Sequence, residues 1–119
     1  MTTRLPALGI DLAKHTFDVH LLRETHVSSH HFANTPHGFE TLAQWLKRQG
    51  MEQVHACMEA TGTRREMRLS LFLYQAGHQV SIVNPARIVA FRKSEGGRTK
   101  TDKQDAKLIA QFCARDDTL

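Results

Sequence analysis

Residues 8–12 read Leu-Gly-Ile-Asp-Leu, and this stretch decides the fold that the sequence predicts. Leu8, Ile10 and Leu12 alternate with glycine and aspartate, which is the two-residue period of a half-buried strand. Aspartate is depleted in strand interiors, so the presence of Asp11 on the less apolar face suggests that this residue has a specific role. We expect a first strand that carries one acidic side chain.

The segments that follow predict a mixed sheet. Two more strands, at residues 17–22 and 27–32, follow after short turns and suggest an antiparallel meander. Helical and strand patterns then alternate, with a helix from 36, a strand at 54–58, a helix from 63, a strand at 80–83, a helix from 85 and a last helix from 101. A meander followed by βα units predicts an α/β fold with helices packed on the sheet.

Capping patterns set two of these helix starts. Residues 63–66 and 101–104 each fit a capping box. The first of these helices is expected to turn an apolar face toward the core at Met67, Leu71 and Tyr74. The apolar stripe of the last helix is expected at Leu108, Ile109 and Phe112.

Composition narrows the class of protein. The 119 residues are 40% hydrophobic and 24% charged, which predicts a single globular domain over residues 1–119. No apolar run reaches the length of a membrane span and no secretory signal is visible, so we expect a cytoplasmic protein without a membrane partner. Cys57 and Cys113 cannot form a disulfide scaffold and are expected to be reduced thiols packed as small hydrophobes.

The positions of four acidic residues suggest a functional site. These residues are Asp11, Glu59, Asp102 and Asp105. Glu59 ends a short apolar strand, and functional residues of α/β sheets often lie there. Asp102 and Asp105 lie one turn apart on the last helix, with Asp105 on its apolar side. If that helix packs over the carboxyl end of the sheet, the four carboxylates converge.

Such a cluster needs cations to neutralise it. Oxygen ligands select Mg²⁺ or Mn²⁺, and two ions would suit displacement at a phosphodiester. Structural roles stay open on the residues alone: the helix dipole favours Asp102, Glu59 could cap the next turn, and Asp105 could pair with a neighbouring lysine.

Basic residues concentrate in the second half of the chain. Residues 60–119 hold 11 basic and 6 acidic side chains, against 5 and 6 in residues 1–59. A basic surface suits a nucleic-acid backbone, while charge balance for the carboxylates is the alternative. The candidate nucleic-acid contacts are Lys14, Arg87, Arg92, Lys93, Arg98, Lys100 and Lys103. Zinc is not expected, because the eight histidines and two cysteines form no His-x-x-x-His or Cys-x-x-Cys pair.

Several blocks together carry a family resemblance. They are Gly9–Lys14, Asn34–Phe39, Met58–Gly62, Ala76–Val80, Val83–Arg87 and Lys100–Ala106. In order and spacing they resemble the DEDD transposases, a bacterial insertion-sequence family related to the Piv DNA invertases and described as bridge-RNA-guided recombinases. The resemblance implies a ribonuclease-H-like, RuvC-like fold. Its metal-binding carboxylate tetrad falls on Asp11, Glu59, Asp102 and Asp105.

The resemblance also implies partners and a larger enzyme. A DNA substrate, a guide RNA and a homo-oligomeric synaptic complex are expected in a bacterial cytoplasm. Full-length members carry a C-terminal domain with a catalytic serine, so residues 1–119 are expected to be the N-terminal catalytic fragment. Residues 63–65, Thr-Arg-Arg, depart from the aromatic residue that the family usually has there.

The expected function is that of the metal-binding catalytic domain of a DNA transposase or recombinase. One alternative is a non-catalytic nucleic-acid-binding module derived from such an enzyme. Another is an actin-like ATPase domain. The ATPase would need a glycine-rich phosphate turn after the first strand, where residues 13–15 read Ala-Lys-His.

Overall fold

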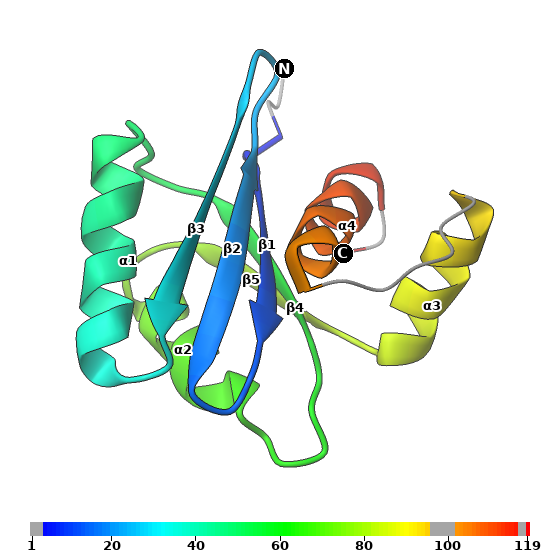
Figure 1. Cartoon of the computed structure of the whole chain (residues 1–119). Helices are drawn as coiled ribbons and strands as arrows, with labels where there is room; N and C mark the ends of the chain where they lie inside the picture. Colours follow the sequence, from blue (N-terminus) through cyan, green and yellow to red (C-terminus); the bar gives the residue numbers. More distant parts are fainter. Residues whose placement is uncertain (1–3, 96–101, 117–118) are drawn as a thin grey trace.

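A mixed five-stranded sheet with the strand order β3-β2-β1-β4-β5 forms the centre of the molecule (Figure 1). The computed structural model describes residues 4–95, 102–116 and 119, and for residues 102–104 it describes the backbone alone. β1 pairs antiparallel with β2 and parallel with β4, as the predicted meander and βα units require. The strands are β1 (Ala7–Leu12), β2 (Thr16–Leu22), β3 (Val27–Ala33), β4 (His55–Glu59) and β5 (Gln79–Val83).

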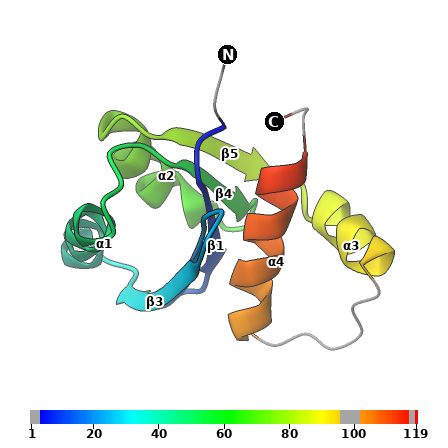
Figure 2. The same ribbon diagram turned by 90° about the horizontal axis from the view of Figure 1, so that it is seen from above.

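Helices cover both faces of the sheet (Figure 2). α1 (Pro36–Arg48) and α2 (Glu66–Gln75) enclose one core together with the side chains of Leu8 and Ile10. α3 (Pro85–Ser94) and α4 (Asp102–Arg115) cover the opposite face, where Ile88 and Ile109 form a second, smaller core. The alternation predicted for the first strand is confirmed, because its leucine and isoleucine side chains face the larger core.

Gly9 allows α4 to lie directly on β1. A Cβ at position 9 would stand 2.1 Å from the carbonyl oxygen of Ala106 and 2.4 Å from the backbone nitrogen of Ala110. Glycine permits such a close approach of two backbones, because it has no side chain to fill the space. The odd-numbered positions of β1 therefore face α4, and Asp11 shares that face.

The start of α1 agrees with its sequence signals. Thr35 has extended backbone angles and its side chain accepts a hydrogen bond from the Gly38 N–H, while Pro36 occupies the first turn. Gly50 follows the helix with a φ of 77°, which suits a residue that ends a helix in the left-handed region. The helix after β5 likewise begins with a side-chain cap, in which Asn84 accepts from the Ala86 N–H.

The prediction for α2 was wrong in its start and in its buried face. The helix begins at Glu66, and Arg64 has a φ of 58°, which prevents a regular helix from starting at Thr63. The expected apolar face is exposed, since Leu71 is 55% and Tyr74 70% accessible. Leu69 and Leu73, on another side of the helix, enter the core instead. Helical spacing alone could not distinguish the two apolar sides.

The last helix carries its predicted stripe, with Ile109 and Phe112 buried. The capping box expected at residues 101–104 lies outside the described side chains. The expectation of two reduced thiols was wrong, because Cys57 of β4 and Cys113 of α4 form a disulfide with Cα atoms 6.0 Å apart. Their sequence separation of 56 residues gave no sign of this pairing, which the packing of α4 on β4 creates. Every described helix is too short or too polar to cross a lipid bilayer.

Candidate functional site

Asp11 and Glu59 stand toward the carboxyl ends of two parallel strands. The paired register of β1 and β4 ends at Ile10 and Met58, and Asp11 and Glu59 are the next residues on the two strands. Both side chains project to the α4 face, because Gly9 two residues earlier meets α4 and Cys57 two residues before Glu59 is bonded to it. Parallel pairing therefore places two carboxylates on one face at one edge of the sheet.

Asp105 reaches the same region from α4. It precedes Ala106, whose carbonyl lies over Gly9, and it is only 6% exposed. The end of α4 lies near the start of β1, where Arg4 donates to the carbonyl of Ala114. α4 crosses the sheet (Figure 2): Ala106, near its start, adjoins Asp18 of β2 and lies over Gly9 of β1, and Cys113, near its end, is bonded to Cys57 of β4. The predicted burial of Asp105 against the sheet is confirmed.

The fourth predicted carboxylate, Asp102, is the first residue of α4. Its backbone lies one turn before Asp105, and its side chain lies outside the described part of the chain. Among the side chains that the structure describes, the one group of three acidic, histidine or cysteine ligands close enough to share an ion is His55, Cys57 and Cys113. Asp11, Glu59 and Asp105 therefore gather on one face without forming such a group in this conformation.

Arg92 neutralises Asp105. Its Nη2 lies 3.0 Å from Oδ1 of the aspartate, and the two side chains are 22% and 8% exposed. Burying a carboxylate costs free energy unless an opposite charge or hydrogen bonds compensate for the lost hydration. Arg92, which the sequence suggested as a nucleic-acid contact, thus connects α3 to the acidic face of the site.

Asp18 is an acidic neighbour that sequence reasoning missed. It lies directly opposite Asp11 in the antiparallel pair of β1 and β2, so the two side chains share a face. Its carboxylate accepts a hydrogen bond from Nδ1 of His31 on β3. A cavity of about 310 Å³ adjoins these residues and reaches Ala106 of α4. The alternation in residues 16–22 placed Asp18 on the polar face, but the register that sets it opposite Asp11 was not predictable.

Of the other predicted nucleic-acid contacts, the structure describes the side chains of Lys14, Lys93 and Arg87. Lys14, in the β1–β2 turn, and Lys93, near the end of α3, are exposed. Arg87 forms an ion pair with Asp116, and its guanidinium lies 5.2 Å from the centre of the Phe112 ring. The positions of Arg98 and Lys100, and the side chain of Lys103, lie outside the described residues.

A buried glutamate, Glu66, holds the turn that follows Glu59. Glu66 is 5% exposed and accepts hydrogen bonds from the hydroxyl and the backbone N–H of Thr61, at 2.6 and 3.0 Å. Burial raises the pKa of Glu66, but these hydrogen bonds and the nearby Arg64 outweigh burial and hold the pKa below its usual value. The turn that follows β4 is therefore held by an ionised side chain.

Comparisons with known proteins match this fold and order of residues. A family model described as transposase, that of the IS110-type DEDD transposases, matches residues 8–119. The pilin gene-inverting proteins of Moraxella bovis and Moraxella lacunata are 41% and 40% identical over 111 residues. Each alignment covers 92% of this chain and 34% of the relative, so the chain spans about a third of the length of these proteins.

Two solved structures share the fold. RuvC from T. thermophilus in complex with a Holliday junction substrate superposes with a TM-score of 0.61 at 14% identity, covering 97% of this chain and 98% of that one. A Thermus thermophilus RuvC structure gives a TM-score of 0.55 at 13% identity, covering 91% and 92%. The predicted RuvC-like, ribonuclease-H-like fold is confirmed. With the family match over nearly its whole length, the chain belongs to the DEDD transposases.

Proposed function

We propose that this chain is the metal-binding catalytic domain of a DNA transposase or recombinase that cuts and rejoins DNA strands. The observation that carries the proposal is the arrangement of Asp11, Glu59 and Asp105 on one face, at the carboxyl ends of β1 and β4. Membership of a transposase family supports the reaction class. The family relatives are named for inverting a pilin gene, which supports DNA as the substrate.

The donor set fits hard divalent cations. Asp11, Glu59 and Asp105, with Asp102 at the start of the same helix, offer carboxylate oxygens alone, and Mg²⁺ and Mn²⁺ prefer such ligands. We assign these four residues to the metal and propose that two ions bind. When bound, such ions stabilise the charge on the attacking and leaving oxygens of a phosphodiester.

Arg92 links the metal site to the nucleic acid in this proposal. Its guanidinium neutralises Asp105 in the structure. A cation among the carboxylates would replace that charge and would free the guanidinium for a bidentate contact with a phosphate. Arg92 lies on α3, so α3, which contacts Asp105 of α4 through this guanidinium, would then position the DNA backbone. Arg87, Lys93 and Lys14 extend the contact over neighbouring phosphates, with Arg98, Lys100 and Lys103 from the segment between α3 and α4 and the start of α4.

Phosphate contacts position a nucleic acid without reading its sequence, so target choice requires another partner. A guide RNA and assembly of several copies into a synaptic complex belong to the proposal for the full-length enzyme. A bacterial cytoplasm is the compartment proposed for it. The competing function, a module that binds nucleic acid without cutting it, uses the same basic residues and differs only in needing no metal.

Titration with Mg²⁺ and Mn²⁺, followed by NMR and calorimetry, tests the metal site. We expect saturable shifts at residues of β1, β4 and α4 that Asp11→Asn and Glu59→Gln remove. Glu52→Gln is the matched control, because Glu52 is an exposed acid in the loop before β4. Unchanged binding in both site variants would contradict the carboxylate assignment. DNA binding that needs no divalent ion, in a chain that binds none, would favour the non-catalytic module.

A further inference from the structure

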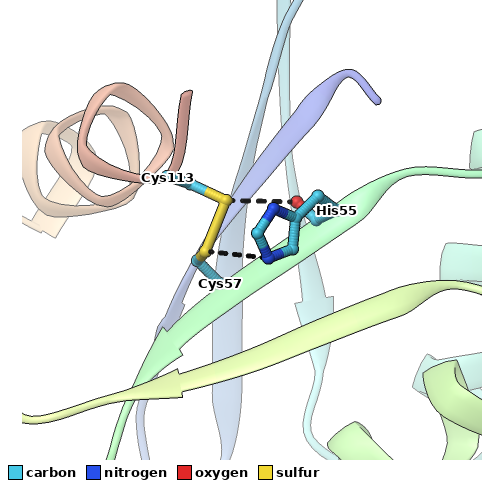
Figure 3. A group of neighbouring side chains, drawn as sticks. All are labelled: His55, Cys57 and Cys113. Atoms are coloured by element: carbon cyan, nitrogen blue, oxygen red, sulfur yellow. Dashed lines mark hydrogen bonds between the residues drawn. A yellow bond between two sulfur atoms is a disulfide. The ribbon is translucent and has the colours of Figure 1, made fainter. Parts of the chain in front are cut away.

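The disulfide that joins α4 to β4 has a histidine beside it (Figure 3). His55 and Cys57 are two residues apart on β4, so both project to the α4 face, where Cys113 approaches them from the helix. The imidazole nitrogen and the two sulfur atoms all lie within 4.8 Å of one another. Cys57 and Cys113 are 0% and 3% exposed, whereas His55 is half-buried.

The spacing of these atoms matches a tetrahedral metal site. Nε2 of His55 lies 3.8 Å from Sγ of Cys57. A tetrahedral zinc ion with the usual bond lengths separates a nitrogen and a sulfur ligand by about 3.6 Å and two sulfur ligands by about 3.8 Å. The nitrogen–sulfur spacing is already close to that of a zinc site. The sulfur–sulfur spacing requires the two sulfur atoms to move apart, by a small side-chain rotation, once the bond between them is reduced.

A fourth position is open to solvent. A cavity of about 170 Å³ is lined by His55, Cys113, Arg4 and Asp116, among others, and is large enough for water. The Ser81 hydroxyl lies 2.7 Å from Nε2 of His55, the same nitrogen that faces Cys57. A metal ion would take over that nitrogen and would leave the hydroxyl free to hold a metal-bound water.

We propose that His55, Cys57 and Cys113 form a zinc site when the disulfide is reduced, with water as the fourth ligand. A dithiol reductant gives two electrons and two protons to the S–S bond and becomes a cyclic disulfide, which leaves two cysteine thiols. Zn²⁺ then displaces the two thiol protons and binds both sulfurs and the imidazole nitrogen. Thiolate and imidazole ligands suit Zn²⁺ and disfavour Mg²⁺, so this site is chemically distinct from the carboxylates.

The proposed zinc site would perform the structural task of the disulfide. Either link holds the C-terminal half of α4 on β4, while the N-terminal turn of the same helix carries Asp105. The sequence did not reveal the site, because its two strand ligands follow a His-x-Cys spacing and the third comes 56 residues after Cys57.

Cobalt titration of the reduced chain tests the proposal, because Co²⁺ in a tetrahedral sulfur site gives visible d–d bands and a sulfur-to-metal charge-transfer band. The 119-residue chain is reduced until two thiols are titratable, and Co²⁺ and then Zn²⁺ are added. We expect one Co²⁺ per chain, displaced by Zn²⁺, and no binding to the oxidised chain. His55→Ala should weaken Co²⁺ binding by about 100-fold or more, which exceeds the usual loss when a residue that only orients a metal ligand is removed.

Control variants make the outcome decisive. His37→Ala removes an exposed histidine on α1, on the other face of the sheet, and should leave binding unchanged. Cys57→Ser and Cys113→Ser should abolish the charge-transfer band. If circular dichroism shows that either variant does not fold, the rate of thiol alkylation in the wild-type chain serves as the test instead. Zn²⁺ should slow alkylation of both thiols by at least tenfold. A reduced, folded chain that shows no cobalt band and no protection would overturn the proposal.

Discussion

Gly9→Ala should break the contact that positions α4 over the carboxylates. The new methyl carbon would lie 2.1 Å from the carbonyl oxygen of Ala106, where ordinary contacts begin at 3.4 Å, so helix and strand must separate by about 1.3 Å. Both obstructing groups are backbone atoms and cannot rotate away. Overpacking a core in this way costs about 3 kcal/mol, which lowers the melting temperature of a domain of this size by about 10 °C.

Urea unfolding followed by circular dichroism measures this loss, and Gly62→Ala is the matched control. Position 62 has an ordinary backbone conformation, and a Cβ there would meet nothing within 4 Å. The control should change the free energy of unfolding by less than about 0.5 kcal/mol. Because Asp105 precedes Ala106, the displaced helix should also bind Mg²⁺ more weakly in Gly9→Ala. A Gly9→Ala variant as stable as Gly62→Ala would refute the placement of α4 on β1.

Three further predictions concern charge and the link between α4 and β4. Arg92→Gln removes the guanidinium from Asp105 and should lower the free energy of unfolding by about 1–3 kcal/mol. Mg²⁺ should restore more stability to this variant than it adds to the wild type, and a thermal melt in which Mg²⁺ stabilises both equally would contradict this. Reducing the Cys57–Cys113 disulfide opens a loop of 56 residues and should cost up to about 4 kcal/mol in metal-free buffer, measured by urea unfolding with and without a reductant; equal stability in both would show that the link does not hold the fold. The free energy of unfolding should fall as the pH drops below about 6.5, because histidines of the unfolded chain then take up protons more readily than the same buried histidines of the folded chain. A flat stability profile between pH 7 and pH 5 would contradict this. The pKa is lowered, chiefly by burial, in three histidines: His20, His55 and His78.

Local signals in the sequence predicted most of the fold. The two-residue alternation of residues 8–12 fixed which face of β1 is apolar, because neighbouring side chains in a strand must point to opposite sides. Thr35 and Pro36 predicted the first helix, because they satisfy its free backbone groups within one turn of the chain. Such signals act between residues close in sequence, so they can be interpreted without knowing the fold.

The features that the sequence did not reveal all depend on contacts between distant segments. α2 has two apolar sides, and only its docking on β4 and β5 decides that Leu69 and Leu73 are buried. Asp18 acquires its place beside Asp11 from the register of a hairpin, which a shift of one residue would have reversed. The bond between Cys57 and Cys113 exists only because α4 crosses back over β4.

The sequence pointed to four acidic residues both by their positions in the expected elements and by the family resemblance, and their assignment to a metal stays a prediction. Asp11 was unusual in a strand interior, Glu59 ended a short apolar strand, and Asp105 lay on an apolar helix side. The structure confirms that Asp105 is buried and that these three share a face. Arg92 on Asp105 was beyond sequence reasoning, because nothing local indicates which of the many basic residues faces a given carboxylate.

α4 connects the acidic face of the sheet with the disulfide. Its contacts with the sheet fall at separate points, with Ala106 and Ala110 over Gly9 of β1 and Cys113 bonded to Cys57 of β4. Asp105 and Cys113 are eight residues apart, or about 12 Å along a rigid helix. If the helix moves as a rigid body, a shift at the sulfur end should tilt it about the Gly9 contact and move Asp105. The state of Cys57 and Cys113, bonded, reduced or metal-bound, should therefore alter Mg²⁺ affinity at the carboxylates although the two groups share no ligand.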